Sequence, residues 1–368
     1  MDYYPVLKNI DGCTVAAICD FDENTRKALA AAVDGETAIV SGWEELISCG
    51  IDAVILANYF HEHASYAIRA MEAGIDVVSE TTAAPTAGEC LDLVECCERT
   101  GRKYMLAANC PVMVGPAELA RVYRSGELGG VLYAEAEYLH PIADEDSIKF
   151  APTPTHWRRF LPGTYYNMHS LGVLMAATGL MPKSVTAMDI YTESCKNSRS
   201  VNDNKSAGAI ALYRMEGGAV FRSTGCCSMG PKGKWYRLTC DGGTVETERG
   251  NQDRVLLRKN GRGAVLYDPD MQYTREEKKA GHGGADARIC RLIFDYLTGA
   301  AEPTFDVYRS AALSLAGIYG LYSILEGKTL NIPDITDKAA REALRGDYRS
   351  PFPDENGKRT LKFGYSDK

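Results

Sequence analysis

The first part of the chain alternates between short apolar runs and helical patterns. Thr14–Cys19, Asp52–Ala57 and Asp76–Val78 are the apolar runs, and each is bounded by polar or turn residues. Asn24–Val33, which is rich in alanine, and His63–Ala73 are helical patterns between them. Apolar strands that alternate with helices through short loops are typical of a parallel sheet with helices on both faces. The pattern therefore predicts an α/β fold for this part.

The pattern changes at Gly129–Gly130. Val131–Tyr138, Ala207–Met215 and Trp235–Cys240 alternate apolar and polar residues, and turns that contain glycine separate such stretches. Alternation of this kind is typical of antiparallel strands with one buried face. Helical patterns at Asp286–Leu297 and Val307–Leu325 would cover that face.

The length of the chain agrees with two domains, because 368 residues are too many for one comfortable core. We expect a domain with the parallel sheet over residues 1–128. Residues 129–368 are expected to form a second α/β domain with a large, mostly antiparallel sheet and a charged C-terminal tail.

The charge and the cysteine content of the chain limit the kinds of partner and ligand that we expect. The formal charge is −8, and no long block of Lys and Arg occurs, which argues against nucleic-acid and anionic-membrane surfaces. We find no signal peptide and no apolar segment long enough to span a bilayer. The 12 cysteines show no C-x-x-C spacing, so reduced thiols in the cytoplasm are expected and no metal site is predicted.

Polar residues follow the ends of the predicted parallel strands, where ligands bind in this architecture. They are Asp20, Asn58, Glu80 and Asn109. An acidic residue at the position of Asp20 can accept hydrogen bonds from the ribose hydroxyls of a dinucleotide, although it can also simply cap the next helix.

The glycine-rich turn that should accompany such a site is missing. Only nineteen residues precede Asp20, they hold a single glycine, Gly12, and G-x-G-x-x-G occurs nowhere else. Tyr3–Ile10 looks like the end of the first helix of a dinucleotide fold. We therefore expect that the first strand and its phosphate turn are absent, through a late start or a true loss.

Histidine and tyrosine supply the candidate proton-transfer groups. Tyr166 and His169 stand three residues apart at the predicted start of a helix and would share one face, although an aromatic helix start that packs on the sheet is an equal alternative. Tyr138 and His140 would share a face at a strand end. His61-Glu-His63 has the spacing of a metal pair but lacks a third ligand, so we interpret it as loop geometry.

Taken together and in order, these residues resemble the Gfo/Idh/MocA oxidoreductases, the family of glucose–fructose oxidoreductase and inositol dehydrogenase. The resemblance covers nearly the whole chain. It rests on Ala17–Asp20, Asp52–His63, Ala73–Glu80, Asn109, Ser125–Tyr133, His156–Arg158, Tyr166–Gly172 and Gly327–Asp334.

The resemblance implies a Rossmann domain that binds NAD or NADP, followed by an open-faced sheet domain that binds a sugar or polyol. Asp20 would hold the ribose and favours NAD. Asn58, Tyr59 and His61 would line the cofactor. Glu80 and Asn109 would approach the nicotinamide end, and Thr81 belongs to the same expected cofactor site.

Two positions depart from the dehydrogenases of that family. They carry Glu-Lys-Pro, whose Lys assists proton transfer, where this chain has Glu80 and then Thr81. They also carry Asp four residues before the catalytic His, where this chain has Tyr165. Of the usual Lys, Asp and His, only His169 remains.

At these positions the chain resembles one branch of the family, the members similar to NAD-dependent α-N-acetylgalactosaminidase. By that resemblance Tyr138, Tyr166 and His169 would contact substrate, together with His140. His282-Gly-Gly-Ala-Asp286 also looks like this branch, which adds His282 to the expected substrate site. Arg158 would contact the cofactor.

Three functions follow from these expectations. The first is an NAD(P)-dependent oxidoreductase that transfers a hydride from a sugar carbinol carbon, with His169 and Tyr166 as the catalytic pair. The second is a redox-neutral glycosidase that uses tightly bound NAD. The third is a non-catalytic binding protein that has lost its cofactor. A homo-oligomer formed through the C-terminal sheet is also expected.

Overall fold

The parallel part of the fold consists of two small sheets. The computed structural model describes residues 3–141, 151–191, 206–226 and 229–363. Strands β1 (Ala17–Cys19) and β2 (Ala38–Val40) pair in parallel, and β3 (Ala53–Leu56), β4 (Asp76–Ser79) and β5 (Tyr104–Leu106) form a second parallel sheet. Among the described strands no ladder joins these two sheets. The predicted parallel strands with intervening helices are confirmed.

The helices of this part begin and end at residues suited to those positions. Thr86 caps α5 (Ala87–Thr100) by accepting a hydrogen bond from the amide of Glu89, and Gly101, with φ 66°, ends it in the left-handed conformation. The helices of the first part are α1 (Tyr3–Leu7), α2 (Glu23–Ala32), α3 (Trp43–Ser48), α4 (His63–Glu72), α5 (Ala87–Thr100) and α6 (Val114–Arg124).

The rest of the chain forms a nine-stranded sheet in the order β13-β12-β11-β10-β6-β9-β8-β7-β14. Only β6 and β9 pair in parallel, and the other neighbours are antiparallel. The strands are β6 (Val131–Leu139), β7 (Pro182–Ile190), β8 (Gly208–Met215), β9 (Val220–Cys226), β10 (Gly233–Cys240), β11 (Gly243–Thr247), β12 (Val255–Lys259), β13 (Ala264–Tyr267) and β14 (Leu330–Asn331). This confirms the expected large, mostly antiparallel sheet.

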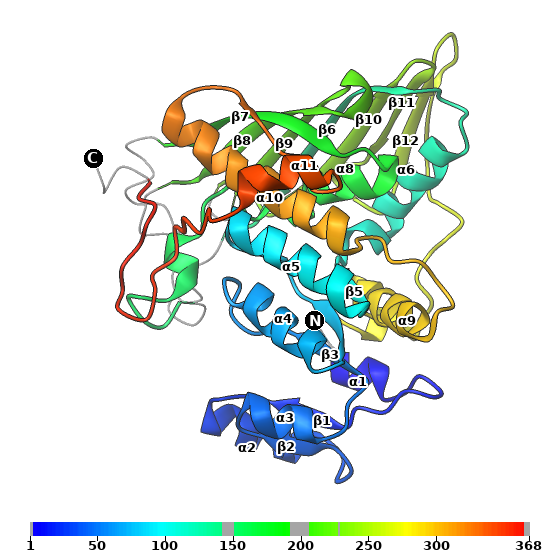
Figure 1. Ribbon diagram of the computed structural model, residues 1–368. Coiled ribbons are helices and arrows are strands. Elements are labelled where there is room, and N and C mark those ends of the chain that lie inside the picture. The colour runs from blue at the N-terminus through cyan, green and yellow to red at the C-terminus, as the bar shows by residue number, and fades with distance from the viewer. Residues whose placement is uncertain (1–2, 142–150, 192–205, 227–228, 364–368) are drawn as a thin grey trace.

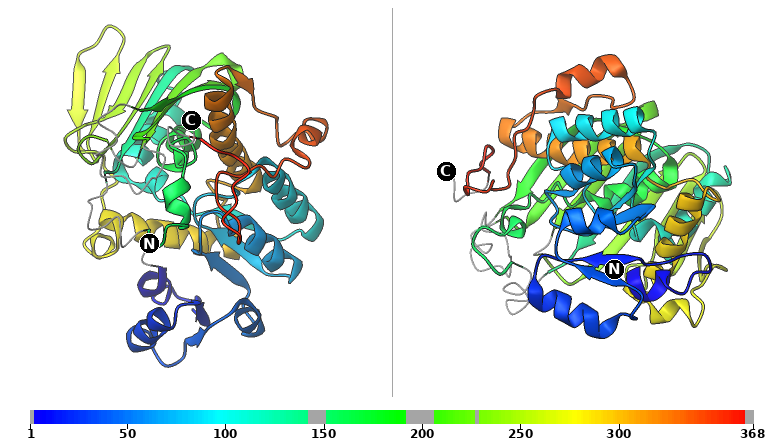
Figure 2. Two further views of the ribbon diagram at one scale, coloured as in Figure 1. Left: turned by 90° about the vertical axis from the view of Figure 1, so that its left-hand side faces the viewer. Right: turned by 60° about the horizontal axis from the view of Figure 1, so that its bottom comes forward.

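Helices cover one face of the large sheet and leave the other open (Figures 1 and 2). They are α6, α8 (Leu171–Thr178) and α10 (Val307–Glu326), with the short α11 (Lys338–Arg341) beyond them. The expectation that a helix over Asp286–Leu297 covers this face is wrong, because Ile289 and Ile293 of α9 (Ala285–Thr298) pack with Val78 and Met105 of the parallel part. Helix α10 packs on β7 and also on α5, so it connects the large sheet to the parallel part. None of the helices in the described part of the chain has both the length and the apolar content that crossing a bilayer requires.

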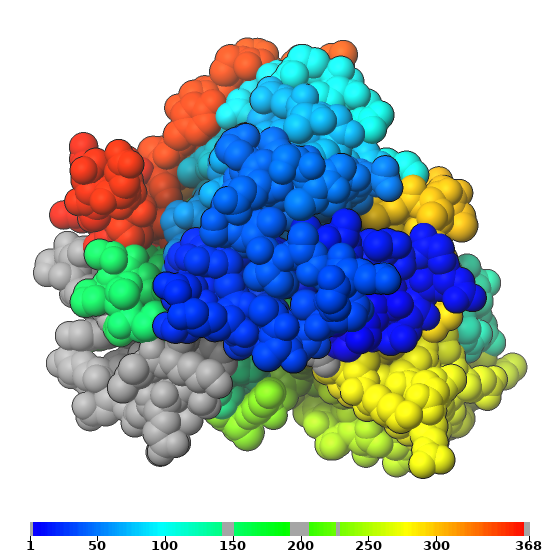
Figure 3. Space-filling model, turned by 90° about the horizontal axis from the view of Figure 1, so that it is seen from below, coloured from blue at the N-terminus to red at the C-terminus, as the bar shows by residue number. Residues whose placement is uncertain are grey.

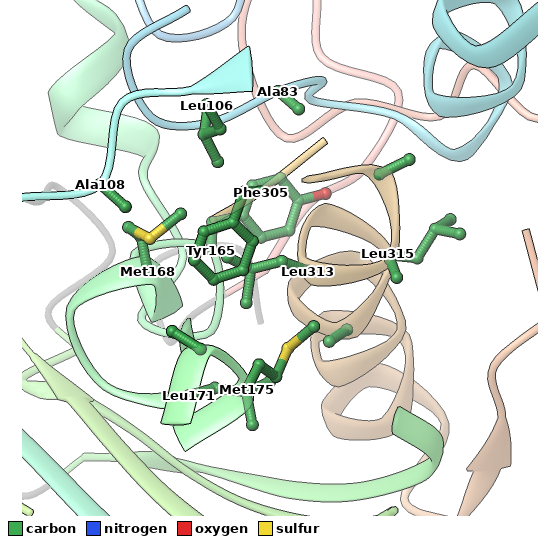
Figure 4. Packing of buried hydrophobic residues seen from close by; sticks show 14 of the residues in the cluster. Ala83, Leu106, Ala108, Tyr165, Met168, Leu171, Met175, Phe305, Leu313 and Leu315 are labelled. Carbon is green, nitrogen blue, oxygen red and sulfur yellow. The ribbon is translucent and has the colours of Figure 1, made fainter. Parts of the chain in front are cut away.

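A shared core fills the space between the parallel strands and α10. Tyr165, Met168 and Leu171 surround Phe305 and Leu313 there (Figure 4), and all five side chains are buried. The amide of Leu106 on β5 donates to the carbonyl of Phe305 at 3.0 Å. The segment just before α10 therefore extends the edge of the parallel sheet.

The N-terminal residues lie across the underside of the molecule. Figure 3 shows them in blue at the centre of this face, next to the yellow segment that includes the residues around 280. Helix α1 packs against α9 there. The expected helix near Tyr3–Ile10 is therefore present as Tyr3–Leu7.

Candidate functional site

Aromatic and histidine rings converge beneath the large sheet. The ring centroid of Tyr138 lies 4.5 Å from that of His169 and 5.9 Å from that of Tyr166. Tyr166 and His169 are 4.8 Å apart, and His140 stacks on Tyr138 at 5.7 Å. The structure therefore brings together the tyrosines and histidines that the sequence placed at two separate motifs.

The local helix around His169 differs from the expected α-helix. Asn167–His169 is a 3-10 helix, and Tyr166 directly precedes it. Tyr166 itself stands outside this helix, with φ −87° and ψ 38°, and its ring centroid lies 4.8 Å from that of His169. The two rings are therefore neighbours, although they do not share a face of one helix.

Hydrogen bonds and a close backbone approach fix this turn in place. The Asn167 amide donates to the carbonyl of Leu313 on α10 at 3.0 Å. The hydroxyl groups of Ser170 and Ser223 lie 2.7 Å apart, which ties the turn to β9. A Cβ on Gly225 would come within 2.8 Å of the Gly163 carbonyl oxygen, so only glycine lets the preceding segment lie this close to β9.

His169 sits in an environment that keeps it neutral. Burial of the ring lowers its pKa to about 3, and the positive charge of Lys234 contributes in the same direction. Its Nδ1 lies 3.1 Å from Cys110 Sγ, and Tyr236 donates to its backbone carbonyl at 2.8 Å. The imidazole is therefore an uncharged group near neutral pH.

His282 is held by a buried carboxylate. Its Nδ1 lies 2.8 Å from Oδ1 of Asp286, the only acidic residue in the first turn of α9. The backbone of His282 has φ 53°, a conformation that residues other than glycine rarely adopt. The carboxylate orients the ring and leaves Nε2 directed elsewhere. His282 also lowers the pKa of His169 electrostatically, so it belongs to the same site.

Glu80 faces this site from the end of β4. Burial raises the pKa of its carboxyl group, and Asp286 adds to the rise. The hydroxyl of Tyr3 on α1 donates to Glu80 Oε1 at 2.8 Å. The amide of Ala107 donates to the carbonyl of Ser79, so Glu80 and Asn109 follow neighbouring strand ends.

The other predicted cofactor residues gather at the ends of β1 and β3. The half-exposed ring of Tyr59 lies 5.9 Å from Phe21, 6.2 Å from His61 and 5.3 Å from His156. Phe21 directly follows Asp20, whose Oδ1 accepts from the amide of Asp22 at 2.8 Å. Two strand ends and the segment that carries His156 therefore meet at Tyr59.

Arg158 lies two residues after His156, in the 3-10 helix Trp157–Phe160. Its guanidinium stands 4.4 Å from the ring centroid of Trp157. The structure therefore places it beside the group around Tyr59, with Glu80, Thr81 and Asn109 on the neighbouring strand ends.

In the His61-Glu-His63 motif, His63 makes hydrogen-bond contacts that hold the loop. The buried ring of His63 contacts the carbonyl oxygens of Thr82 at 2.8 Å and Asn58 at 3.2 Å, which links the loops after β3 and β4. Within the described ranges, no three His, Cys, Asp or Glu side chains form a group that could hold a metal ion.

Two buried polar atoms at these strand ends lack a protein partner among the described residues. They are Oδ1 of Asn109 and Nδ1 of His61. Buried polar groups are normally hydrogen-bonded, and an unpaired one points to a ligand or water. Both belong to the set predicted to hold a dinucleotide, so the residues present fit that cofactor along the strand ends.

Sequence reasoning missed the residues that complete the site around His169. Cys110, Lys234 and Tyr236 contact His169 or Tyr138, or act on them electrostatically. They lie far from His169 along the chain, and no local motif marks them. Only the register of β6 against β10, in which Lys234 faces Tyr138, could have identified Lys234.

Comparisons with known proteins identify relatives of this chain in sequence and in fold. Residues 2–108 match the family model described as "Oxidoreductase family, NAD-binding Rossmann fold" under the name Gfo/Idh/MocA. A glycosyl hydrolase family 109 protein of Shewanella pealeana is 30% identical over 376 residues, which cover 89% of this chain and 81% of that protein.

Solved structures share the fold. An oxidoreductase from Agrobacterium radiobacter, crystallised with NAD+, L-tartaric acid and magnesium, gives a TM-score of 0.74 at 16% identity and covers 89% of this chain and 94% of its own. An inositol dehydrogenase homologue from Azotobacter vinelandii, crystallised with NADH and myo-inositol, gives 0.64 at 18% identity and covers 85% and 88%.

Proposed function

The chain belongs to the Gfo/Idh/MocA oxidoreductase family, and on that premise we propose that it oxidises a carbinol carbon of a sugar or sugar derivative with NAD, or with NADP in its place. The observation that carries this proposal is the convergence of Tyr138, Tyr166 and His169 beneath the large sheet. In this proposal the rings of Tyr138, Tyr166 and His169 flank the sugar, and the uncharged imidazole of His169 is the base.

The nicotinamide supplies, when bound, the acceptor for the hydrogen of the carbinol carbon. Asp20 would accept hydrogen bonds from the ribose, and Tyr59 offers an exposed ring beside it. Asn109 has an unpaired amide oxygen for the nicotinamide end. The proposed cofactor site comprises Asp20, Asn58, Tyr59, His61, Glu80, Thr81, Asn109 and Arg158.

The residues of the chain handle the proton of the substrate hydroxyl. Neutral His169 accepts it, because burial keeps the imidazole uncharged. Tyr166, next to this ring, positions the hydroxyl. His140 and His282 complete the substrate site, with Asp286 fixing the orientation of His282.

The second candidate is the redox-neutral glycosidase that uses tightly bound NAD. The relative from Shewanella pealeana is named a family 109 glycosyl hydrolase, which favours this candidate. Tyr138, His140, Tyr166 and His169 would serve it equally well, because both reactions start from the same bound hydroxyl.

A panel of sugars and aryl glycosides tests both functions. With added NAD+ and sugars, we expect absorbance of reduced nicotinamide at 340 nm to rise for at least one sugar. Release of nitrophenol from a nitrophenyl glycoside without added cofactor would instead establish the glycosidase. If neither signal appears, and native mass spectrometry finds no bound dinucleotide, the third expectation, a binding protein, replaces both.

We also propose that the open face of the large sheet joins two copies of the chain. Met188 on β7 and Ile210 and Leu212 on β8 are 73%, 39% and 45% exposed, and Met188 pairs with Ile210 across the strands. Beside them Arg222 bridges Glu135 and Glu137. A flat apolar patch bordered by charge pairs is typical of a subunit interface.

The double variant Met188→Glu, Leu212→Glu should therefore release a smaller species. Two carboxylates in a buried apolar interface are costly unless paired. Light scattering after gel filtration measures the mass, and Lys183→Glu, also on β7, serves as the control. An unchanged mass for the double variant would place the interface elsewhere.

A further inference from the structure

Lys234 occupies an unusual position on the large sheet. It faces Tyr138 in the antiparallel register of β10 and β6, and directly opposed residues project to the same side of a sheet. That side carries the helices, and Tyr236 and Leu238, which share it, are completely buried. A lysine therefore enters the interior where the tyrosine and histidine rings converge.

The ammonium group of Lys234 lies against the proposed substrate site. Its Nζ stands 5.7 Å from the ring centroid of Tyr138 and 3.5 Å from Sδ of Met113. Burial lowers the pKa of His169 and the charge of Lys234 lowers it further, whereas at Cys110 the same charge offsets part of the rise in pKa that burial causes. In the described ranges, no ion pair joins this ammonium to a carboxylate.

The proposed chemistry needs a cation at this place. A proton moves from an alcohol to an imidazole whose pKa burial holds at about 3 only if the negative charge left on oxygen is strongly stabilised. The dehydrogenases that this chain resembles have a lysine after the glutamate, where this chain has Thr81. This chain therefore has no lysine at the position directly after Glu80, at the end of β4.

We propose that Lys234 is a further active-site residue whose ammonium group donates a hydrogen bond to the substrate oxygen that loses its proton to His169. Lys234 stays protonated, and no bond to it forms or breaks. It stabilises the negative charge on that oxygen from the large sheet instead of from the end of β4. This inference rests on the proposed function, because it requires a hydroxyl that is deprotonated.

The alternative is that Lys234 has only a structural role, and an experiment can distinguish this from a role in catalysis. The alkyl chain of a lysine can cover an aromatic ring while the charged end remains in water. Lys234→Met keeps that chain and removes only the charge, and Lys234→Arg keeps the charge. The matched control is Lys328→Met, which alters an exposed lysine two residues before β14 of the same sheet.

The experiment measures kcat and KM of the four proteins on the substrate that the panel identifies, as a function of pH. We expect Lys234→Met to lose on the order of 100-fold in kcat with a small change in KM, since the removed interaction is strongest in the transition state. Lys234→Arg should recover part of the loss, and Lys328→Met should equal the parent protein.

The pH profile distinguishes a charge from a packing role. The groups that face His169 are Tyr138, His140, Tyr166, Cys110, Lys234 and His282. Removing the one permanent cation among them raises the pKa of His169, so the acid limb of kcat/KM should move to higher pH in Lys234→Met and stay fixed in Lys328→Met.

The outcomes separate the two proposals. An active parent protein with an equally active Lys234→Met overturns the role of Lys234 and leaves the proposed function intact. A loss of kcat without a shift of the acid limb, with arginine no better than methionine, shows a packing role and also overturns it. A parent protein inactive on the whole panel overturns the proposed function and this inference with it.

Discussion

Replacing His169 by glutamine should lower kcat on the order of 10²–10⁴-fold, the usual contribution of a positioned base. Glutamine has a similar reach and keeps polar atoms near Cys110 Sγ, which lies 3.1 Å from Nδ1 in the parent protein. It cannot accept a proton, so the loss falls on the chemical step. Steady-state kinetics on the identified sugar measures it. Turnover at the parental rate would assign the base elsewhere, with His282 as the next candidate.

The same variant has a readout that needs no substrate. The pKa of His169 falls from the ordinary 6.5 to about 3 in the folded protein, mainly through burial. Between pH 6.5 and 3, His169 therefore binds a proton in the unfolded chain but not in the folded chain. The free energy of unfolding consequently decreases as the pH falls toward 3. His169→Gln should reduce this slope by up to about 1.4 kcal/mol per pH unit between pH 6 and 4.

A neighbouring substitution controls for disturbance of the turn. Met168 lies in the same 3-10 helix, with its side chain in the core (Figure 4). Met168→Leu conserves volume and should keep both the parental kcat and the parental acid slope. Equal acid slopes in His169→Gln and the parent protein would show that His169 is not buried as a neutral group.

The second large effect is expected from Gly317→Ala in α10. A Cβ at this position would lie 2.8 Å from the carbonyl oxygen of Thr164 and 3.1 Å from Cα of Tyr165. Both are backbone atoms of the segment that leads into Tyr166 and His169, so the segment must move. We expect a loss of about 1–3 kcal/mol in the free energy of unfolding, measured with urea, as for overpacked cores.

The variant should lose activity as well as stability, because the displaced segment positions the tyrosine and histidine rings. Gly320→Ala is the matched control in the same helix. Its Cβ would meet Cγ2 and Cβ of Thr164 at 3.0 and 3.1 Å, with no backbone atom among its nearest contacts, so we expect a smaller loss of stability than for Gly317→Ala. If Gly317→Ala is as stable as the control, the close contact between α10 and this segment does not fix the site.

The strands and helices of the parallel part were readable from the sequence. A short run of apolar residues between polar ones is typical of a buried strand, so Asp52–Ala57 was predicted as a strand. Strand β3 spans Ala53–Leu56. Tyr166 and His169 were predicted to lie together on one helix face, and their rings are 4.8 Å apart although Tyr166 precedes the 3-10 helix. Local spacing was sufficient in each case, since the partners are neighbours in the sequence.

The surroundings of His169 could not be read in this way. Cys110 and Tyr236 reach it from segments 59 and 67 residues away along the chain. Lys234 joins them through the register of β10 against β6, which depends on how a whole sheet assembles. No local pattern distinguishes this lysine from a solvated one.

The sequence by itself therefore determined the two kinds of sheet, the strand-end positions of Asp20 and Glu80, and the spacing of Tyr166 and His169. These properties depend on residues that are close along the chain. The tertiary structure alone decided that His169 is neutral, that Asp286 orients His282 and that Lys234 faces Tyr138. The physical reason is that burial and charge arise between side chains that only the folded chain brings together.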